Sequence, residues 1–175
     1  LKLGAVTTLI LLVIGLPLAW GLSGRRSFFK LIIEAVVTMP LVLPPSVLGF
    51  YLLVAFSPER GFGRWLHQVF DLQLVFSFKG LVLASAIYSL PFMVSPVKSA
   101  FQQLPTSLAQ ASYTLGKTKW QTFWHVLLPN IKPTLITAAV LTFAHTLGEF
   151  GVVLMIGGNI PGITRVASIA VYNSV

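Results

Sequence analysis

The stretch LGAVTTLILLVIGLPLAWGL, residues 3–22, contains no charged side chain over 20 residues. Three further runs are nearly as apolar. One of them has no charged residue, and each of the other two has a single acid, Glu34 or Glu149. A helix needs about 20 apolar residues, in a range of roughly 17–25, to cross the hydrocarbon core of a bilayer. The sequence therefore predicts membrane spans at approximately 3–22, 31–56, 80–97 and 133–156.

The composition supports the same class of protein. Hydrophobic residues make up 55% of the 175 residues and charged residues only 9%, whereas soluble domains carry about 25% charged residues. A signal peptide would explain the first apolar run but not the other three. We expect an all-α, polytopic bundle of transmembrane helices forming one domain over residues 1–175. The absence of cysteine excludes disulfides and thiolate metal sites.

Basic residues predict the orientation of the bundle, because cytoplasmic loops of membrane proteins carry an excess of Lys and Arg. One side holds seven of them: Arg25, Arg26, Lys30, Lys98, Lys117, Lys119 and Lys132. The other side holds five, together with Glu59 and Asp71: Lys2, Arg60, Arg64, Lys79 and Arg165. We expect the first side to be cytoplasmic and the N-terminus to lie outside.

The second run is interrupted by Pro40, Pro44 and Pro45. Proline removes a backbone donor and clashes with the preceding turn, so this helix must kink or break. Broken backbone at membrane depth is tolerated where protein buries it or where it lines a water-filled cavity. Pro44, Pro45 and Ser46 are therefore candidates for a pathway or gate. A kink that only serves helix packing is an equally good interpretation, and Ser46 then serves only packing and hydrogen bonding.

Residues 98–132 are helical in pattern but too polar to span a membrane. Ser107 and Gln110 have the spacing of a capping box, and Thr118 with Gln121 repeats it. Gly116 is placed to end the first helix in a left-handed conformation, and Pro129 is expected to end the second. Four apolar residues of the second helix share one face: Trp120, Phe123, Trp124 and Leu127. The pattern predicts two short amphipathic helices with a glycine between them.

This segment resembles the signature of binding-protein-dependent ABC importer permeases. Gln110-Ala111-Ser112, then Gly116, then Val126-Leu-Leu-Pro129 reproduce the spacing of Glu-Ala-Ala, Gly and Ile-x-Leu-Pro in that family. The departures are Gln110, Ser112 and Val126, and Gln110 keeps the capping role but lacks the family's charge. The resemblance implies that Gln110, Ala111, Ser112, Gly116 and Pro129 couple the spans to an ATPase.

Two more stretches are similar to molybdate permeases, and the second is shared with sulfate permeases. They are Leu41-Val-Leu-Pro-Pro-Ser-Val-Leu-Gly-Phe-Tyr-Leu-Leu53, and Leu147-Gly-Glu-Phe-Gly151 with the segment 158–165. The chain begins at Leu1 and stops at Val175 in what reads as a loop, so we expect a fragment that lacks the family's final span.

The resemblance implies a multi-pass permease of the cell membrane that imports molybdate by alternating access. Its expected partners are a second copy of the subunit, two cytoplasmic ATPase subunits and an external oxyanion-binding protein. The chain itself is expected to be no enzyme and to hold no cofactor, because it has no phosphate-binding glycine loop. Sulfate or thiosulfate remains an alternative substrate.

Glu149 is the one acid expected in the middle of a span, where ionisable groups mark functional positions. A carboxylate repels a dianion, so we expect Glu149 to fix an outer gate by accepting hydrogen bonds from backbone donors or a cation. His145 lies four residues earlier, but two ligands are too few for a zinc site. A rival hypothesis uses these two residues as a proton relay in a proton-coupled carrier or an intramembrane enzyme.

Overall fold

The computed structural model describes residues 1–25 and 27–172, and only the backbone of Phe70. Arg26, one of the expected cytoplasmic basic residues, lies outside the described residues, as do residues 173–175. The described chain is entirely helical, which confirms the expected fold class. Its elements in order are α1 (Lys2–Ser23), α2 (Phe28–Val42), α3 (Pro45–Phe56), α4 (Gly61–Phe70), α5 (Phe78–Gln103), α6 (Thr106–Thr114), α7 (Lys119–Thr122), η1 (Phe123–Leu127), α8 (Leu128–Gly148), α9 (Gly151–Gly157) and α10 (Ala167–Tyr172).

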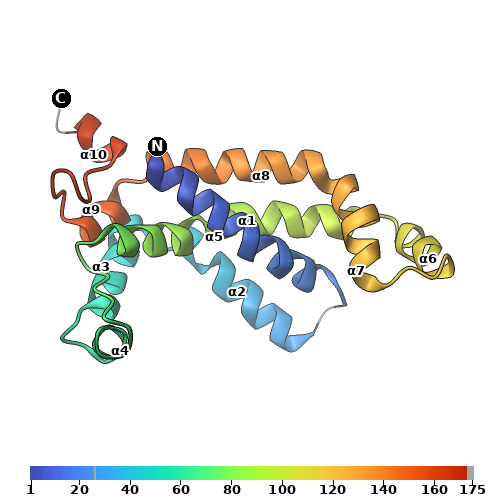
Figure 1. Cartoon of the computed structure of the whole chain (residues 1–175), viewed down its shortest axis with the longest axis horizontal. Coiled ribbons are helices and arrows are strands. Elements are labelled where there is room, and N and C mark those ends of the chain that lie inside the picture. The colour runs from blue at the N-terminus through green and yellow to red at the C-terminus, as the bar shows by residue number, and fades with distance from the viewer. Residues whose placement is uncertain (26, 173–175) are drawn as a thin grey trace.

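Three long helical segments in the described part of the chain are apolar enough to cross a membrane. They are α1, α5 and the continuous stretch of 30 residues formed by α7, η1 and α8. In Figure 1, α5 and α8 run side by side along the long axis of the molecule, and α1 packs obliquely against both. Helix α7 turns away from this axis at the right of the picture. Helix α8 ends at Gly148 and α9 begins at Gly151, so the apolar run 133–156 contains a helix break.

Helices α2 and α3 are the fourth candidate span, and they are strongly bent. Their axes differ by 117° at the break between Val42 and Pro45. Pro40 is accommodated inside α2, whereas Pro44 is extended and Pro45 begins α3. The break that the prolines predict therefore occurs at the second and third of them. Figure 1 shows α3 leaving the bundle sideways at the end where the N-terminus lies.

The core of the bundle is formed where α1, α5 and α8 meet. Apolar side chains such as Met93, Val97 and Ile131 are fully buried there. A layer of hydroxyl groups is buried among the same helices: Thr7, Ser85, Ser89, Thr142 and Thr146. In a membrane, small and hydroxylated residues at helix interfaces permit close approach and interhelical hydrogen bonds. Ser89 illustrates this, because its Oγ lies 3.0 Å from Thr146 Oγ1.

An ion pair joins α2 to α5. Lys98 of α5 donates to the carboxylate of Glu34 of α2. The lysine side chain is 15% exposed and the glutamate side chain 40% exposed. Because the lysine side chain is mostly buried, the pairing offsets part of the cost of removing its charge from water. The pair ties α2 to the end of α5 that leads into α6.

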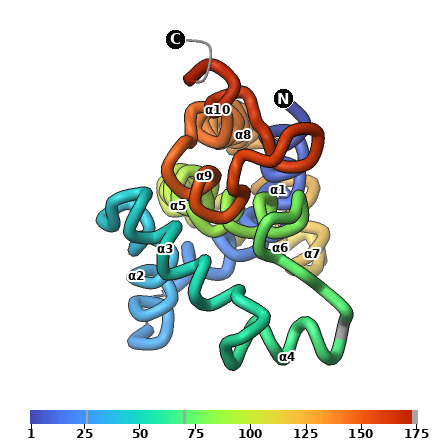
Figure 2. The backbone as a smooth tube through the Cα atoms, turned by 90° about the vertical axis from the view of Figure 1, so that its left-hand side faces the viewer, coloured from blue at the N-terminus to red at the C-terminus, as the bar shows by residue number. Residues whose placement is uncertain are grey.

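Different elements form the two ends of the bundle, as Figures 1 and 2 show. The end formed by α6, α7 and the connection from α1 to α2, called the inner end here, carries Arg25, Lys30, Lys117 and Lys119. The opposite end, the outer end, carries the N-terminus, α3, α4, α9 and α10. By sequence the opposite side also carries five basic residues, together with Glu59 and Asp71. The inner end therefore has an excess of positive charge, which agrees with a cytoplasmic inner end under the positive-inside rule.

Candidate functional site

Two helix breaks meet at the outer end, and together they form the candidate gate. The first lies between α2 and α3 at Pro44, and the second lies at Glu149, between α8 and α9. They touch through Gly151: a Cβ atom built there would lie 2.8 Å from Pro45 Cβ and 3.2 Å from the backbone nitrogen of Ser46. Only a residue without a side chain permits this approach. The structure thus brings together the proline motif and Glu149, which are 104 positions apart, from 45 to 149.

A cavity of about 400 Å³ opens beside this contact. Two of the predicted gate residues, Pro45 and Glu149, line it, together with Tyr88, His145, Gly148, Phe150 and Gly151. The other two, Pro44 and Ser46, flank Pro45 and are exposed to solvent or lipid. The cavity therefore joins residues of α3, α5, α8 and α9 at one place.

The carboxyl group of Glu149 is enclosed. The residue is 5% exposed, and neither carboxyl oxygen has a hydrogen-bond partner among the described residues. The Ser85 hydroxyl is an electrostatic neighbour, yet the two groups lack hydrogen-bond geometry. The backbone is better held, since Ser168 Oγ donates to the Glu149 carbonyl at 2.6 Å. The carboxyl group was expected to accept hydrogen bonds from backbone donors or from a cation. Among the described residues, no such group contacts it.

His145 does not form a pair with Glu149 on one helical face, because α8 ends between them at Gly148. Its Nδ1 lies 3.0 Å from Ser89 Oγ. The imidazole ring stacks on Phe92 with 3.9 Å between centroids and lies 4.9 Å from the Tyr88 ring. The His145 side chain is therefore part of the packing between α5 and α8 at the wall of the cavity.

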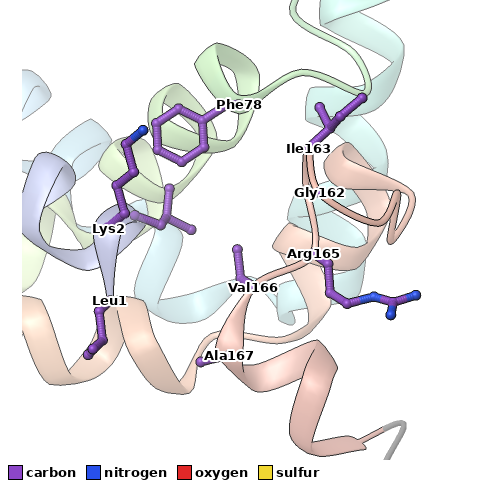
Figure 3. A pocket seen from close by; sticks show the side chains of 9 residues that line it. Leu1, Lys2, Phe78, Gly162, Ile163, Arg165, Val166 and Ala167 are labelled. Carbon is purple, nitrogen blue, oxygen red and sulfur yellow. The ribbon is translucent and has the colours of Figure 1, made fainter.

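Sequence reasoning missed Tyr88 and Gly151 as parts of this site. Gly151 was visible as the last residue of the Leu147–Gly151 motif, but its role follows only from the approach of Pro45. Nothing in the sequence distinguishes Tyr88 from other aromatic residues in apolar runs. A second cavity at the outer end, of about 470 Å³, contains none of the predicted residues. Figure 3 shows Lys2 there, with its Nζ 5.3 Å from the centre of the Phe78 ring.

The candidate coupling segment lies at the inner end, at the opposite end of the spans from the two breaks (Figure 1). Helix α6 ends in a Schellman motif: Gly116 has φ of +75° and donates to the Tyr113 carbonyl at 2.9 Å, and Lys117 donates to Ser112 at 3.1 Å. The left-handed glycine is thus confirmed. Gln110 and Ala111 are exposed on α6.

The start of the next helix is also as expected. Thr118 and Gln121 form a complete capping box, in which each side chain accepts from the other residue's backbone N–H. Buried Ser112 connects the two helices, because its Oγ lies 2.9 Å from Thr122 Oγ1. The third residue of the expected signature, Ser112, therefore forms a structural contact between α6 and α7.

Two expectations for this segment were wrong. The first capping box does not form, since α6 begins at Thr106 after Pro105, which leaves Ser107 and Gln110 inside the helix. Pro129 does not end a helix but lies in the first turn of α8. One turn of π-helix precedes it, with Leu128 donating to the Phe123 carbonyl five residues earlier. This wider turn accommodates a residue that lacks an N–H and crowds the preceding carbonyl.

Comparisons with known proteins show which family the sequence matches. A family model described as "Binding-protein-dependent transport system inner membrane component" matches residues 11–174. The chain is 51% identical to the molybdenum transport system permease protein of Azotobacter vinelandii, over 100% of this chain and 77% of that protein. It is 39% identical to the corresponding protein of Escherichia coli K12, over 98% and 75%. The sulfate transport system permease protein of the same strain is 36% identical, over 91% and 57%.

Proposed function

Because this chain belongs to the family of binding-protein-dependent transport system inner membrane components, we propose that it is the permease subunit of an ATP-driven importer of molybdate. The observation that carries the proposal is that the candidate gate and the candidate coupling segment lie at opposite ends of one helix bundle. The joint between two broken helices lies at the outer end, and the exposed coupling segment lies at the inner end. Three to four candidate spans place the chain in the membrane between them.

The subunit itself is a permease and not an enzyme, and its family implies an ATPase and a solute-binding protein as partners. We place the ATPase at the inner end, against the exposed residues Gln110 and Ala111 of α6. Closure of the ATPase subunits then moves α6 and α7 as one body, since Ser112 and Thr122 tie them together. Gly116 sets the angle between the two helices.

A second copy of the subunit completes the pathway in this proposal. Helix α2 supports it, because many of its large apolar side chains are exposed: Phe28 (73%), Phe29 (76%), Val36 (63%), Met39 (56%) and Val42 (83%). Helix α3 also exposes large apolar side chains, and its Tyr51 is 63% exposed. Two such faces in contact would enclose a path beside the break at Pro44.

The gate in this proposal consists of Pro44, Pro45, Ser46 and Glu149. A carboxylate repels a dianion, so Glu149 acts on the helix break and not as a ligand of the substrate. Movement of α8 pulls on Glu149 and, through Gly151, on Pro45. Because of this contact, the helix ends on both sides of the gate would move together when the coupling segment moves.

Sulfate and thiosulfate form the second candidate substrate class. The observation that favours it is the 36% identity to the sulfate permease of Escherichia coli K12. Selection among tetrahedral oxyanions then belongs to the binding protein. Membership in an ATP-driven family sets aside the proton-coupled carrier and the intramembrane enzyme, neither of which uses a coupling segment.

The test is ATP hydrolysis by the full-length subunit reconstituted with its ATPase in proteoliposomes. Stimulation by binding protein loaded with molybdate, and not by the same protein empty or loaded with sulfate, is the expected result. Stimulation by the sulfate-loaded form alone would keep the importer and change its substrate. A firmly bound ATPase that neither form stimulates would remove oxyanion import from consideration.

A further inference from the structure

A deep apolar groove at the inner end is not used by the proposed mechanism. One wall is the last part of α1, with Leu12, Leu16 and Trp20, and the other is α7 and η1, with Trp120, Phe123 and Trp124. Its volume is about 390 Å³. The Trp20 ring joins the two walls, because its centroid lies 5.6 Å from that of Trp120 and 4.6 Å from that of Phe123.

The groove runs from the membrane interior to the membrane–water boundary. The distance from Leu12 to Trp20 along α1 is about 12 Å at 1.5 Å per residue, which is close to half of a ~30 Å hydrocarbon core. Trp120 is 63% exposed and Trp124 is 55% exposed. Tryptophan is enriched at the level of the lipid headgroups, so the aromatic end of the groove marks that level.

Two lysines lie near the aromatic end of the groove, outside the residues that line it. Lys119 directly precedes Trp120 and is exposed. Lys30 reaches the end of α1, since a Cβ atom on Gly24 would lie 3.0 Å from its Nζ. Neither lysine has a carboxylate partner among the described residues. The acid nearest in sequence, Glu34, is paired with Lys98.

We propose that this groove binds one anionic phospholipid of the inner leaflet, with an acyl chain between α1 and η1 and its phosphate at Lys30 and Lys119. The apolar walls fit a hydrocarbon chain, and the unpaired lysines favour an acidic headgroup, because each basic residue near a membrane surface adds attraction to anionic lipid. Since Trp120 belongs to the coupling segment, the bound lipid braces α7 against α1.

The test is tryptophan fluorescence of the full-length subunit in nanodiscs, with Trp65 and any tryptophan outside the groove replaced by Phe. Nanodiscs of phosphatidylcholine receive a small fraction of brominated phosphatidylglycerol or, separately, of brominated phosphatidylcholine. We expect half-maximal quenching at a much lower fraction of the brominated phosphatidylglycerol. The Lys30→Gln/Lys119→Gln variant should raise that fraction roughly tenfold. The matched control, Arg60→Gln/Arg64→Gln, removes the same charge at the outer end and should leave it unchanged.

Equal quenching by both lipids, unaffected by the two lysines, would mean ordinary annular contact and would overturn the proposal. Absence of quenching by either lipid would mean that protein covers the groove, either a second copy or the ATPase, and would overturn it as well. Native mass spectrometry of the same variants gives a second measurement. One phosphatidylglycerol should stay with each wild-type subunit and be lost from the double lysine variant.

Discussion

Glu149 is the one buried acid among the four acidic residues of the chain. Removing a carboxylate from water costs several kcal/mol unless a partner compensates, and its oxygens have no hydrogen-bond partner among the described residues. Such a residue does not serve the stability of this conformation. Its position beside both helix breaks makes a role in switching between conformations the better interpretation.

We therefore expect Glu149→Gln to separate stability from transport. Glutamine keeps the shape of the side chain and removes the charge, so the midpoint of thermal unfolding in detergent should stay equal or rise. Uptake of molybdate into proteoliposomes should fall about tenfold, which corresponds to ~1.4 kcal/mol in the transport barrier.

The control for this variant is Glu59→Gln, which neutralises an exposed acid of the outer end. It should change neither unfolding nor uptake. Wild-type uptake by Glu149→Gln would remove Glu149 from the gate, and a large loss of stability would show that the carboxylate supports the fold.

Individual residues also show where sequence reasoning succeeds. Thr118 and Gly116 were predictable because a capping box and a left-handed cap depend only on residues within a few positions. The pairing of Lys98 with Glu34 was not predicted, although both charges stand out in apolar surroundings. Their contact depends on how α2 packs on α5 across 64 positions, and a single sequence holds no direct record of that packing.

At the scale of elements, the sequence predicted the two helices of the coupling segment and the glycine between them. It did not predict where these helices begin and end. Two short helices and the glycine between them were expected, but Pro129 was expected to end the second. A proline after a short amphipathic pattern usually marks a helix end. Here a π-turn widens the backbone ahead of Pro129, and the helix continues across the membrane. Likewise, the apolar run 133–156 gave no signal for the break at Glu149.

The Schellman motif at Gly116 gives a prediction for this element. Apart from Gly116 itself and its chain neighbours, no heavy atom of the described residues lies within 4 Å of a Cβ built at Gly116, so a side chain would meet no steric obstacle from packed elements. The cost of Gly116→Val comes from the backbone alone, about 1–2 kcal/mol for a left-handed residue and more for a β-branched one. We expect Gly116→Val to abolish ATP-dependent uptake in proteoliposomes while the spans stay folded.

Gly116→Asn is the matched control for this variant, because asparagine adopts the left-handed conformation more readily than other residues. It should keep most of the uptake. Equal loss in both variants would assign the effect to the side chain at the ATPase surface. Full uptake with Gly116→Val would show that the angle between α6 and α7 does not matter for coupling.

At the scale of the whole molecule, the excess of basic residues at the inner end, seven against five, predicts a single orientation. The chain contains no cysteine, so single cysteines can report it directly. Gln68→Cys lies on α4 at the outer end, and Thr114→Cys lies on α6 at the inner end, and both positions are exposed.

In intact cells, a membrane-impermeant maleimide should label Gln68→Cys in the full-length subunit once the outer surface of the membrane is accessible. Thr114→Cys should react only after the membrane is permeabilised. The reverse pattern would invert the orientation, and with it the places assigned to the gate and to the ATPase. Labelling of both before permeabilisation would mean that the chain inserts in two orientations.

The contact between Gly151 and Pro45 also has a consequence for the evolution of this sequence. Because a single added methyl group at position 151 would collide with the α3 start, neither position is free to change alone. Lineages that gain a side chain at 151 should carry a compensating change at 45 or 46, and the two breaks should be inherited as one unit. The joint would then appear in an alignment of relatives as correlated variation between two segments about a hundred positions apart.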